Sequence, residues 1–187
     1  MDKKIEIKAI KIGLVGDSLV GKTSICGTYV SRESRLNNYL IFCPNRNDTK
    51  FKLKNGKEIK LYIWDSNGQK RFRDIALRAM RNCHGVIIVS SLSDKRSFNN
   101  IQEWKNALDD ERIKPYAIFG NKSDYQKDKW EITTEEAKNI ATKFGLPYFE
   151  TSCVTREGID EGFAYVANEI FDNLENKNDN KIYHLFK

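Results

Sequence analysis

The sequence predicts a three-layer α/β domain, in which helices cover both faces of a six-stranded, mostly parallel sheet with one antiparallel strand. Three observations indicate this fold class. Short apolar runs alternate with segments of helical periodicity along the chain, which is the pattern of strand–helix–strand units. An Asn-Gly pair between two strand-like segments predicts one hairpin. With 187 residues and 40% apolar content, the chain can bury one sizeable core beneath about five helices.

The first half of the chain predicts a strand, a helix and the hairpin. An apolar run at 5–15 predicts the first strand, and a glycine-rich loop leads from it to a helix at about 22–32. Strands at 50–54 and 58–64 flank Asn55-Gly56, whose tolerance of positive φ suits a tight turn. We therefore expect these two strands to pair antiparallel.

The second half predicts three further strands and three amphipathic helices. The strands are expected at 85–92, 115–120 and 147–150. A stripe at helical spacing, which we interpret as core rather than chemistry, consists of Phe98, Ile101, Trp104 and Leu108. Thr133 and Glu136 form a capping box for a helix that ends at Lys143. The last helix places on one face Ile159, Phe163, Val166, Ile170 and Leu174.

Charge and cysteine usage argue against several classes of protein. The net charge is +6 and the pI is about 9.0, but the basic residues are dispersed, which disfavours nucleic acid as a partner. Lys50, Lys52 and Lys54 alternate as on the solvent-facing side of a strand. The scattered cysteines indicate reduced thiols rather than zinc ligands or disulfides, and they are Cys26, Cys43, Cys83 and Cys153.

The chain is expected to form one domain at 1–174, followed by a polar tail or linker at 175–187. No apolar run approaches the roughly 20 residues of a bilayer span, and the charged amino terminus differs from a signal peptide. The last cysteine is Cys153, so the tail offers no prenylation site. We expect a cytoplasmic protein without an intrinsic membrane anchor.

The strongest motif is GDSLVGKT at 16–23, which fits the phosphate-binding pattern G-x-x-x-x-G-K-[ST]. It lies between a strand and a helix, where backbone N–H groups and the helix amino terminus can cradle phosphate oxygens. Lys22 can neutralise the β and γ phosphates, and Thr23 can offer its hydroxyl to Mg²⁺. An ordinary glycine turn would leave Lys22 unexplained. The predicted phosphate-binding residues are Gly16, Asp17, Ser18, Leu19, Val20, Gly21, Lys22, Thr23 and Ser24.

The bulky Leu19 is irregular for such a loop and can narrow the approach to the γ phosphate.

A second motif, DSNGQ, follows the strand at 58–64. Asp65 can hold Mg²⁺ through water, Gly68 can offer its N–H to the γ phosphate, and Gln69 can orient the attacking water. These residue types in this order predict nucleotide triphosphate chemistry, with Gln69 and Lys22 as the catalytic residues.

The third motif, NKSD, comes directly after the strand at 115–120 and predicts selection of guanine. The Asp124 carboxylate can accept hydrogen bonds from guanine N1 and N2, which adenine cannot supply because it lacks the 2-amino group. In isolation the tetrapeptide reads as a polar turn. Asn121 and Lys122 complete the motif, while Ser152 and Cys153 follow the last strand and can place a backbone N–H at guanine O6.

These residues together resemble the Ras superfamily of small GTPases, and the Rab family in particular, over about 10–171. The resemblance depends on the three motifs, on Arg71-Phe72 after the second, on the Glu-Thr-Ser run at 150–152, and on the Ser-Phe-Asn-Asn run at 97–100 with Trp104. It implies the three-layer P-loop GTPase fold, or G domain, with Mg²⁺-dependent binding of GTP and GDP. It also implies partners that read two switch loops.

The first switch, at about 34–48, departs from the family pattern. Counting back from the hairpin turn, the threonine that completes the Mg²⁺ shell in the family falls at Phe42, which cannot ligate a metal. Thr49 lies seven residues too late in that register, and Leu36 replaces a base-stacking aromatic. The effector stretch at 43–47 and the pair Ala79-Met80 in the second switch also differ from typical Rab sequences.

The resemblance therefore implies a guanine-nucleotide switch in vesicle traffic or signalling, at a cytoplasmic or peripheral endomembrane location, with slow hydrolysis of GTP to GDP. Its effectors and regulators are expected to differ from typical Rab partners. The alternative is a catalytically idle, nucleotide-bound scaffold that binds a protein partner, and Phe42 favours it while Gln69 favours the active switch. A P-loop kinase is disfavoured because the NKSD motif selects guanine.

Overall fold

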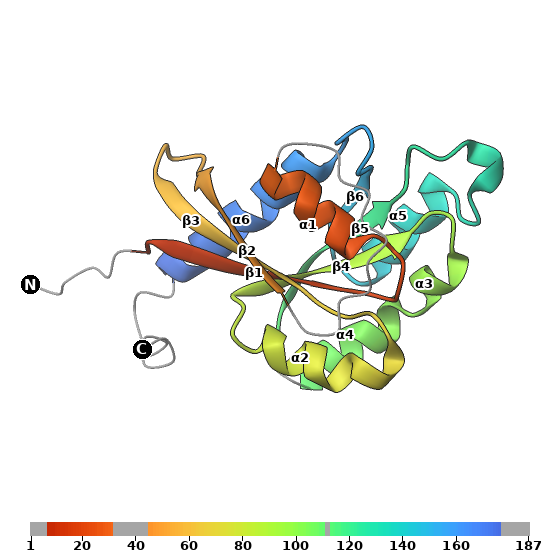
Figure 1. Ribbon diagram of the computed structural model, residues 1–187, viewed down its shortest axis with the longest axis horizontal. Helices are drawn as coiled ribbons and strands as arrows, with labels where there is room; N and C mark the ends of the chain where they lie inside the picture. The colour runs from red at the N-terminus through yellow and green to blue at the C-terminus, as the bar shows by residue number, and fades with distance from the viewer. Residues whose placement is uncertain (1–6, 32–44, 111–112, 177–187) are drawn as a thin grey trace, which may run out of the picture.

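The computed structural model describes residues 7–31, 45–110 and 113–176 (Figure 1). Its single six-stranded sheet has the order β2-β3-β1-β4-β5-β6. The strands are β1 (Ala9–Val15), β2 (Asn45–Lys52), β3 (Glu58–Asp65), β4 (Gly85–Ser91), β5 (Pro115–Asn121) and β6 (Tyr148–Thr151). Only the β2–β3 pair is antiparallel among the strands of the described residues, so the predicted α/β fold class is confirmed.

Helices pack on both faces of the sheet. They are α1 (Lys22–Ser31), α2 (Arg73–Met80), α3 (Lys95–Asn99), α4 (Ile101–Asp110), α5 (Thr134–Lys143) and α6 (Ile159–Asn176). Two short 3₁₀ helices are η1 (Lys70–Phe72) and η2 (Lys127–Lys129). Because α3 and α4 meet at Asn100, they continue one predicted helical stripe, and the described helices form five units. Each helix in the described part of the chain is too short or too polar to cross a bilayer.

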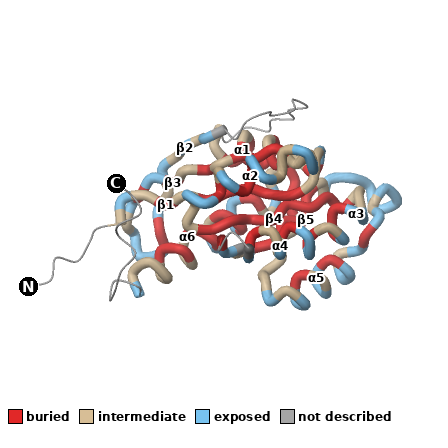
Figure 2. The backbone as a smooth tube through the Cα atoms, turned by 90° about the horizontal axis from the view of Figure 1, so that it is seen from below, coloured by how far each residue is buried: buried red, intermediate tan, exposed pale blue. Residues whose placement is uncertain are grey.

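The central strands separate two hydrophobic cores, and Figure 2 shows that buried residues concentrate along them. Ile87 and Val89 of β4 face the core beneath α1 and α6. Val86 and Ile88 face the core beneath α2, α3, α4 and α5. Alternate residues of a strand point to opposite faces, so this fully buried strand supplies both cores.

The predicted bounds of the second strand, 50–54, were wrong. β2 begins at Asn45 and ends at Lys52, with its ladder running from the Asn45–Asp65 pair to the Lys52–Glu58 pair. The turn then closes at Leu53, whose N–H bonds the Lys57 carbonyl over 2.9 Å. The early part of this strand is polar, so the sequence shows no alternation of apolar and polar residues there. Backbone pairing with β3, rather than burial of side chains, makes it a strand.

Candidate functional site

The predicted motifs converge at the carboxyl edge of the sheet. Gly16 follows β1, Asp65 ends β3, Asn121 ends β5 and Thr151 ends β6. These strands run parallel to one another, so their carboxyl ends lie on the same side. Open α/β sheets bind ligands in the crevice outside this edge. Segments far apart in the sequence are therefore brought into one candidate nucleotide site.

The phosphate loop between β1 and α1 requires its glycines. Gly16 has φ 139° and Gly21 has φ 100°, conformations that side chains with a Cβ rarely adopt. A Cβ at Gly16 would also clash with the Val89 carbonyl, and one at Gly21 with the Asn121 amide. The same amide donates a 2.8 Å hydrogen bond to the carbonyl of Val20. The loop is thus tied to both β4 and β5.

Leu19 departs from this pattern within the same loop. Its φ is 64°, in the left-handed region that costs a non-glycine residue roughly 1–2 kcal/mol. Its side chain is also 74% exposed, the largest exposure among the exposed large hydrophobic residues of the described chain. The loop therefore presents an apolar side chain to solvent, and its predicted narrowing of the approach to the γ phosphate stays a prediction.

Lys22 is the first residue of α1, and its side chain bonds back to the start of the loop. Its side chain is only 5% exposed, and its Nζ donates hydrogen bonds to the Gly16 carbonyl at 2.9 Å and the Asp17 carbonyl at 2.6 Å. Burial lowers the pKa of this amine to about 8, while the nearby carboxylates of Asp65 and Asp17 act in the opposite direction. A buried ammonium of this kind gains strongly from an anion beside it.

Asp65 fits the role of a metal-holding carboxylate. It is 1% exposed, and neither of its side-chain oxygens accepts a hydrogen bond of normal geometry from the described residues. Burial raises the pKa of the Asp65 carboxyl, and the neighbouring Thr23 hydroxyl and Lys22 amine oppose that rise. Buried orphaned oxygens beside a threonine hydroxyl suit Mg²⁺, which takes one or two carboxylates together with substrate phosphates.

The described residues contain no cluster of three or more His, Cys, Asp or Glu side chains that could hold a metal alone. The Ser66 hydroxyl donates a 2.6 Å bond to the Leu14 carbonyl and so fixes the chain just after Asp65. Asp65 and the neighbouring Thr23 hydroxyl therefore lie together at the end of β3, where the sequence predicts the Mg²⁺ ligands.

The start of the second switch packs against the phosphate loop. A Cβ at Gly68 would clash with the Asp17 carbonyl and lie 2.5 Å from the Lys22 amine, so only glycine fits this approach. The Asn67 side-chain oxygen accepts a 2.8 Å bond from the Gln69 backbone N–H. Arg71 Nε donates a 2.9 Å bond to Gln69 Oε1. The predicted catalytic glutamine is thus held at both its backbone and its side chain.

Asn121 connects the predicted base site to the phosphate loop. It is 2% exposed, and besides its bond to Val20 its side-chain oxygen accepts a 3.3 Å bond from the Thr151 hydroxyl. Lys122 adopts a left-handed backbone with φ 69°, which turns the chain sharply after β5. The side chain of Asn121 therefore links the ends of β5 and β6 to the phosphate loop, and its amide keeps a second N–H donor.

Asp124 is exposed and held by Ser152. The Ser152 hydroxyl is fully buried and donates a 2.7 Å bond to Asp124 Oδ1. The same hydroxyl accepts 3.1 Å bonds from the backbone N–H groups of Val154 and Thr155. Cys153 is 5% exposed between them, and burial raises the pKa of its thiol to about 11. The carboxylate is thus oriented by a fixed neighbour while remaining accessible to solvent.

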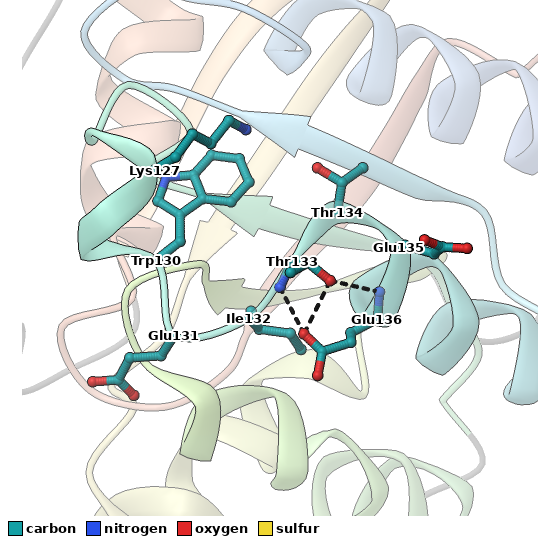
Figure 3. A pocket seen from close by; sticks show the side chains of 8 residues that line it. All are labelled: Lys127, Trp130, Glu131, Ile132, Thr133, Thr134, Glu135 and Glu136. Carbon is teal, nitrogen blue, oxygen red and sulfur yellow. Dashed lines mark hydrogen bonds between the residues drawn. The ribbon is translucent and has the colours of Figure 1, made fainter.

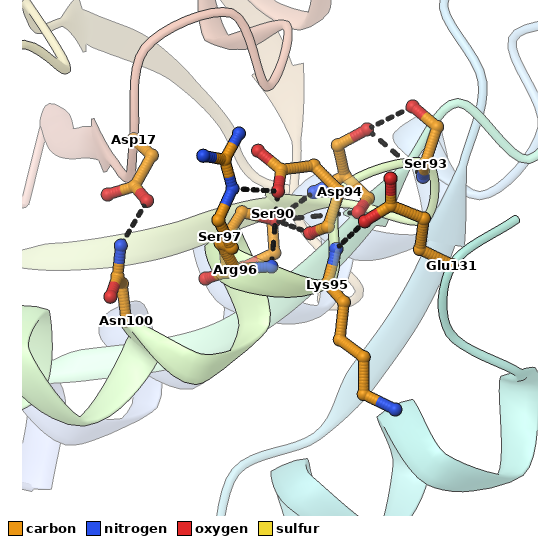
Figure 4. A network of polar contacts seen from close by, with 10 residues as sticks. Asp17, Ser90, Ser93, Asp94, Lys95, Arg96, Ser97, Asn100 and Glu131 are labelled. Carbon is orange, nitrogen blue, oxygen red and sulfur yellow. Dashed lines mark hydrogen bonds and ion pairs between the residues drawn. The ribbon is translucent and has the colours of Figure 1, made fainter.

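Two residues next to this site escaped the sequence prediction. Trp104 is 1% exposed, as expected for core, yet its indole Nε1 donates a 2.9 Å bond to Asp17 Oδ1. Asn100 Nδ2 donates a 2.6 Å bond to Asp17 Oδ2, as Figure 4 shows. A buried indole N–H usually has a hydrogen-bond acceptor, so the sequence could have indicated that Trp104 needs a polar partner, but not that the partner is Asp17.

A separate hollow of about 450 Å³ lies between η2 and the start of α5 (Figure 3). The Lys127 amine lies over the Trp130 ring on one side of it. On the other side, the predicted capping box of Thr133 and Glu136 is confirmed, with each side chain bonding the other residue's backbone. The capping box occupies the backbone N–H groups of Thr133 and Glu136, which are the donors that an anion at this helix end would need.

Comparison with known proteins decides the family. Residues 11–172 match the Ras family. The chain belongs to the Ras family. Its similarity to Rab-named proteins makes it a Rab-like small GTPase, as the sequence predicts.

This small GTPase is similar to several curated proteins over most of its length. It is 36% identical over 171 residues to GTP-binding protein YPTM2 of Zea mays, a match covering 88% of this chain and 81% of that protein. Ras-related protein RABD2b of Arabidopsis thaliana is 36% identical over 167 residues, covering 86% and 79%. Ras-related protein Rab-13 of Canis lupus familiaris is 34% identical over 170 residues, also covering 86% and 79%.

Most of the atypical first switch of this small GTPase lies outside the described residues, including Leu36, Phe42 and Cys43. Its last part is described, because Asn45 to Asp48 form the beginning of β2. In the second switch, Met80 is fully buried in the core beneath α2. The expectations that depend on Phe42 therefore remain predictions.

Proposed function

We propose that this Rab-like GTPase binds GTP and GDP with Mg²⁺ and hydrolyses GTP to GDP slowly. The proposal is carried by one observation: Lys22, Asp65 and Asp124, from three separate motifs, lie at the same edge of the sheet. Lys22 supplies positive charge, Asp65 supplies unpaired carboxylate oxygens, and Asp124 supplies an oriented carboxylate. Polyphosphate, Mg²⁺ and guanine require these three groups respectively.

Each predicted residue takes one role in this proposal. The backbone N–H groups of 16–24 and the Lys22 ammonium bind the phosphates, while Gly68 offers its N–H to the γ phosphate. Thr23 and Asp65 would hold Mg²⁺, which when bound neutralises charge on the phosphate oxygens. Gln69 orients the attacking water. On the base side the residues are Asn121, Lys122, Asp124, Ser152 and Cys153, whose backbone N–H meets guanine O6.

Slow hydrolysis is expected for two reasons. Phe42 replaces the first-switch threonine, so one Mg²⁺ ligand and one γ-phosphate contact are missing from the sequence. In addition, the side-chain oxygen of Gln69 accepts a hydrogen bond from Arg71, which holds the glutamine side chain toward η1. Intrinsic rates in GTPases of this class are low even with the glutamine in place.

A place in vesicle traffic or signalling, in the cytoplasm and at the periphery of endomembranes, is proposed from the similarity to Rab-named proteins. Protein effectors and regulators would then read the two switches. Because the sequence at 43–47 departs from typical Rab effector regions, we expect partners other than the usual Rab effectors. The domain at 1–174 would carry these activities, with the polar tail at 175–187 outside it.

A second candidate function is a nucleotide-bound scaffold without turnover. Phe42 favours it, because loss of the first-switch threonine removes one Mg²⁺ ligand and one γ-phosphate contact while the nucleotide-binding motifs are retained. On this alternative the chain binds its partner equally well with GTP or GDP.

Single-turnover GTP hydrolysis separates the two functions. We expect slow, Mg²⁺-dependent release of phosphate from the wild-type protein, and its loss in Gln69→Ala. Gln126→Ala, which changes an exposed glutamine before η2, is the matched control and should behave as the wild type. Nucleotide that copurifies and binds with Mg²⁺ but never turns over would contradict hydrolysis and favour the scaffold.

A further inference from the structure

Both oxygens of the Asp17 carboxylate accept hydrogen bonds from side chains of α4 and the residue before it. Trp104 Nε1 donates a 2.9 Å hydrogen bond to one of its oxygens. Asn100 Nδ2 donates a 2.6 Å hydrogen bond to the other, as Figure 4 shows. These contacts join residues more than eighty positions apart in the sequence. An indole N–H can only donate, so the buried Trp104 and the Asp17 carboxylate satisfy each other.

Both donors are held firmly. Trp104 is 1% exposed in the core beneath α2, α3, α4 and α5. Asn100 is the residue at which α3 ends and α4 begins, and its backbone N–H bonds the Arg96 carbonyl at 2.9 Å. The burial of Trp104 and the helix-end position of Asn100 fix where the two donors lie.

The position of this carboxylate matters because it belongs to the loop proposed to bind phosphates. The backbone carbonyl of Asp17 accepts a 2.6 Å hydrogen bond from the Lys22 ammonium. The negative charge of the Asp17 side chain raises the pKa of that amine, against the effect of burial. A carboxylate released from α4 could turn toward the bound phosphates and repel them. Retaining it on α4 keeps its charge away from them.

The same helix also holds the second switch. Arg73 begins α2, and its guanidinium carbon lies 4.7 Å from the centroid of the Trp104 ring. Both Arg73 Nη atoms donate 3.2 Å bonds to Glu103, the residue before Trp104. Arg73 therefore connects the second switch to the tryptophan that holds Asp17.

We propose that Trp104 and Asn100 are positioning residues that clamp the Asp17 carboxylate against α4, away from bound nucleotide phosphates. Arg73 stacks on this clamp and links it to the second switch. The inference rests on the proposed function, because it concerns the strength of nucleotide binding. On this proposal Trp104, a core residue by its burial, also positions a side chain of the phosphate loop.

The test is a double-mutant cycle read out as affinity for fluorescently labelled GTP and GDP in Mg²⁺ buffer. Trp104→Phe keeps a buried aromatic ring but removes the donor, and Asn100→Ala removes the other donor. Each should weaken GTP binding about tenfold, and GDP binding less because GDP carries less charge. Adding Asp17→Asn should restore GTP affinity to within about threefold of the wild type, because the freed side chain is then neutral.

Leu108→Val, which loses apolar volume elsewhere on α4, is the matched control and should bind both nucleotides as the wild type does. Asn100→Ala changes a half-buried residue, so it tests the clamp even if Trp104→Phe folds poorly. Single variants with unchanged affinity, or a double variant as weak as the single, would overturn the clamp while leaving the proposed function intact. Failure of the wild type to bind either nucleotide would overturn both.

Discussion

The base-facing and phosphate-facing halves of the candidate site are built from different contacts. In the base-facing half, formed by Asn121, Asp124 and Ser152, side chains bond one another and the backbone. In the phosphate-facing half, formed by residues 16–23 and Asp65, the buried Lys22 ammonium donates hydrogen bonds to two backbone carbonyls. Asp65 is a buried carboxyl whose oxygens accept no hydrogen bond of normal geometry from the described residues.

This difference has consequences for stability and for binding. Residues that are satisfied within the protein hold the fold together, so losing one costs folding free energy as well as affinity. Buried charges without full compensation cost folding free energy and recover it when an oppositely charged ligand binds. Substitutions in the two halves should therefore shift stability in opposite directions while both weaken nucleotide binding.

The largest expected effect is on base recognition. Asp124→Ala removes the proposed acceptor for two guanine donors and should weaken GTP binding roughly 100-fold to 1000-fold. Isothermal titration calorimetry with GTP and GDP measures this loss. The matched control is Asp128→Ala. Asp128 is also an exposed aspartate, but it lies in η2, and its loss should leave the affinity for GTP and GDP unchanged. Equal losses in the two variants would show that Asp124 does not read the base.

The phosphate-facing half should be more stable without its lysine charge. The folded-state pKa of Lys22 is about 8, below the ordinary 10.5, so nucleotide-free protein gains free energy of unfolding as pH rises from about 8 to 10.5. Below pH 8, Lys22→Met should be more stable than the wild type, but by less than the roughly 3 kcal/mol that the pKa shift alone would give, because the Gly16 and Asp17 carbonyls lose their donor.

Urea unfolding of both proteins between pH 7 and 10.5 tests this sign. The advantage of Lys22→Met should shrink as pH rises, because the wild-type amine then loses its proton in the folded state. A variant that is less stable than the wild type at pH 7 would contradict a cost of burying this charge.

Truncating the Asn121 side chain in the base-facing half should destabilise the protein. Asn121→Ala leaves the Val20 carbonyl and the Thr151 hydroxyl without their partner and should lower the free energy of unfolding by about 1–3 kcal/mol. Urea denaturation measures the change. Asn139→Ala, at an exposed position of α5, should change it little and serves as the comparison. An undiminished stability would remove the contrast between the two halves.

The smallest expected effect concerns Leu19. Leu19→Gly relieves a left-handed backbone and loses little burial, so it should raise the free energy of unfolding by up to about 1 kcal/mol. Ile75→Gly also removes an exposed apolar side chain, but from within α2, and should destabilise the protein by about 0.5–1 kcal/mol. Destabilisation by both changes would show that Leu19 is unstrained.

Local patterns predicted much of the fold and the location of the site. The Asn55-Gly56 turn, the capping box at Thr133 and the order of the motifs depend on neighbouring residues, so the sequence alone could indicate them. The early part of β2 could not be predicted, because its polar residues are ordered by pairing with β3. The bond from Trp104 to Asp17 is a tertiary contact, and helical periodicity identified only the buried face of that tryptophan.

The central claim, that this edge of the sheet binds a guanosine polyphosphate, is tested most directly by titrating nucleotide-free protein with GTP and with ATP. Lys22→Met and the exposed Lys138→Ala provide the variant and its control. The account predicts tight GTP binding, ATP binding weaker by at least about 100-fold, and loss of GTP affinity in Lys22→Met alone. Equal affinity for ATP and GTP, or unchanged GTP affinity in Lys22→Met, would contradict it.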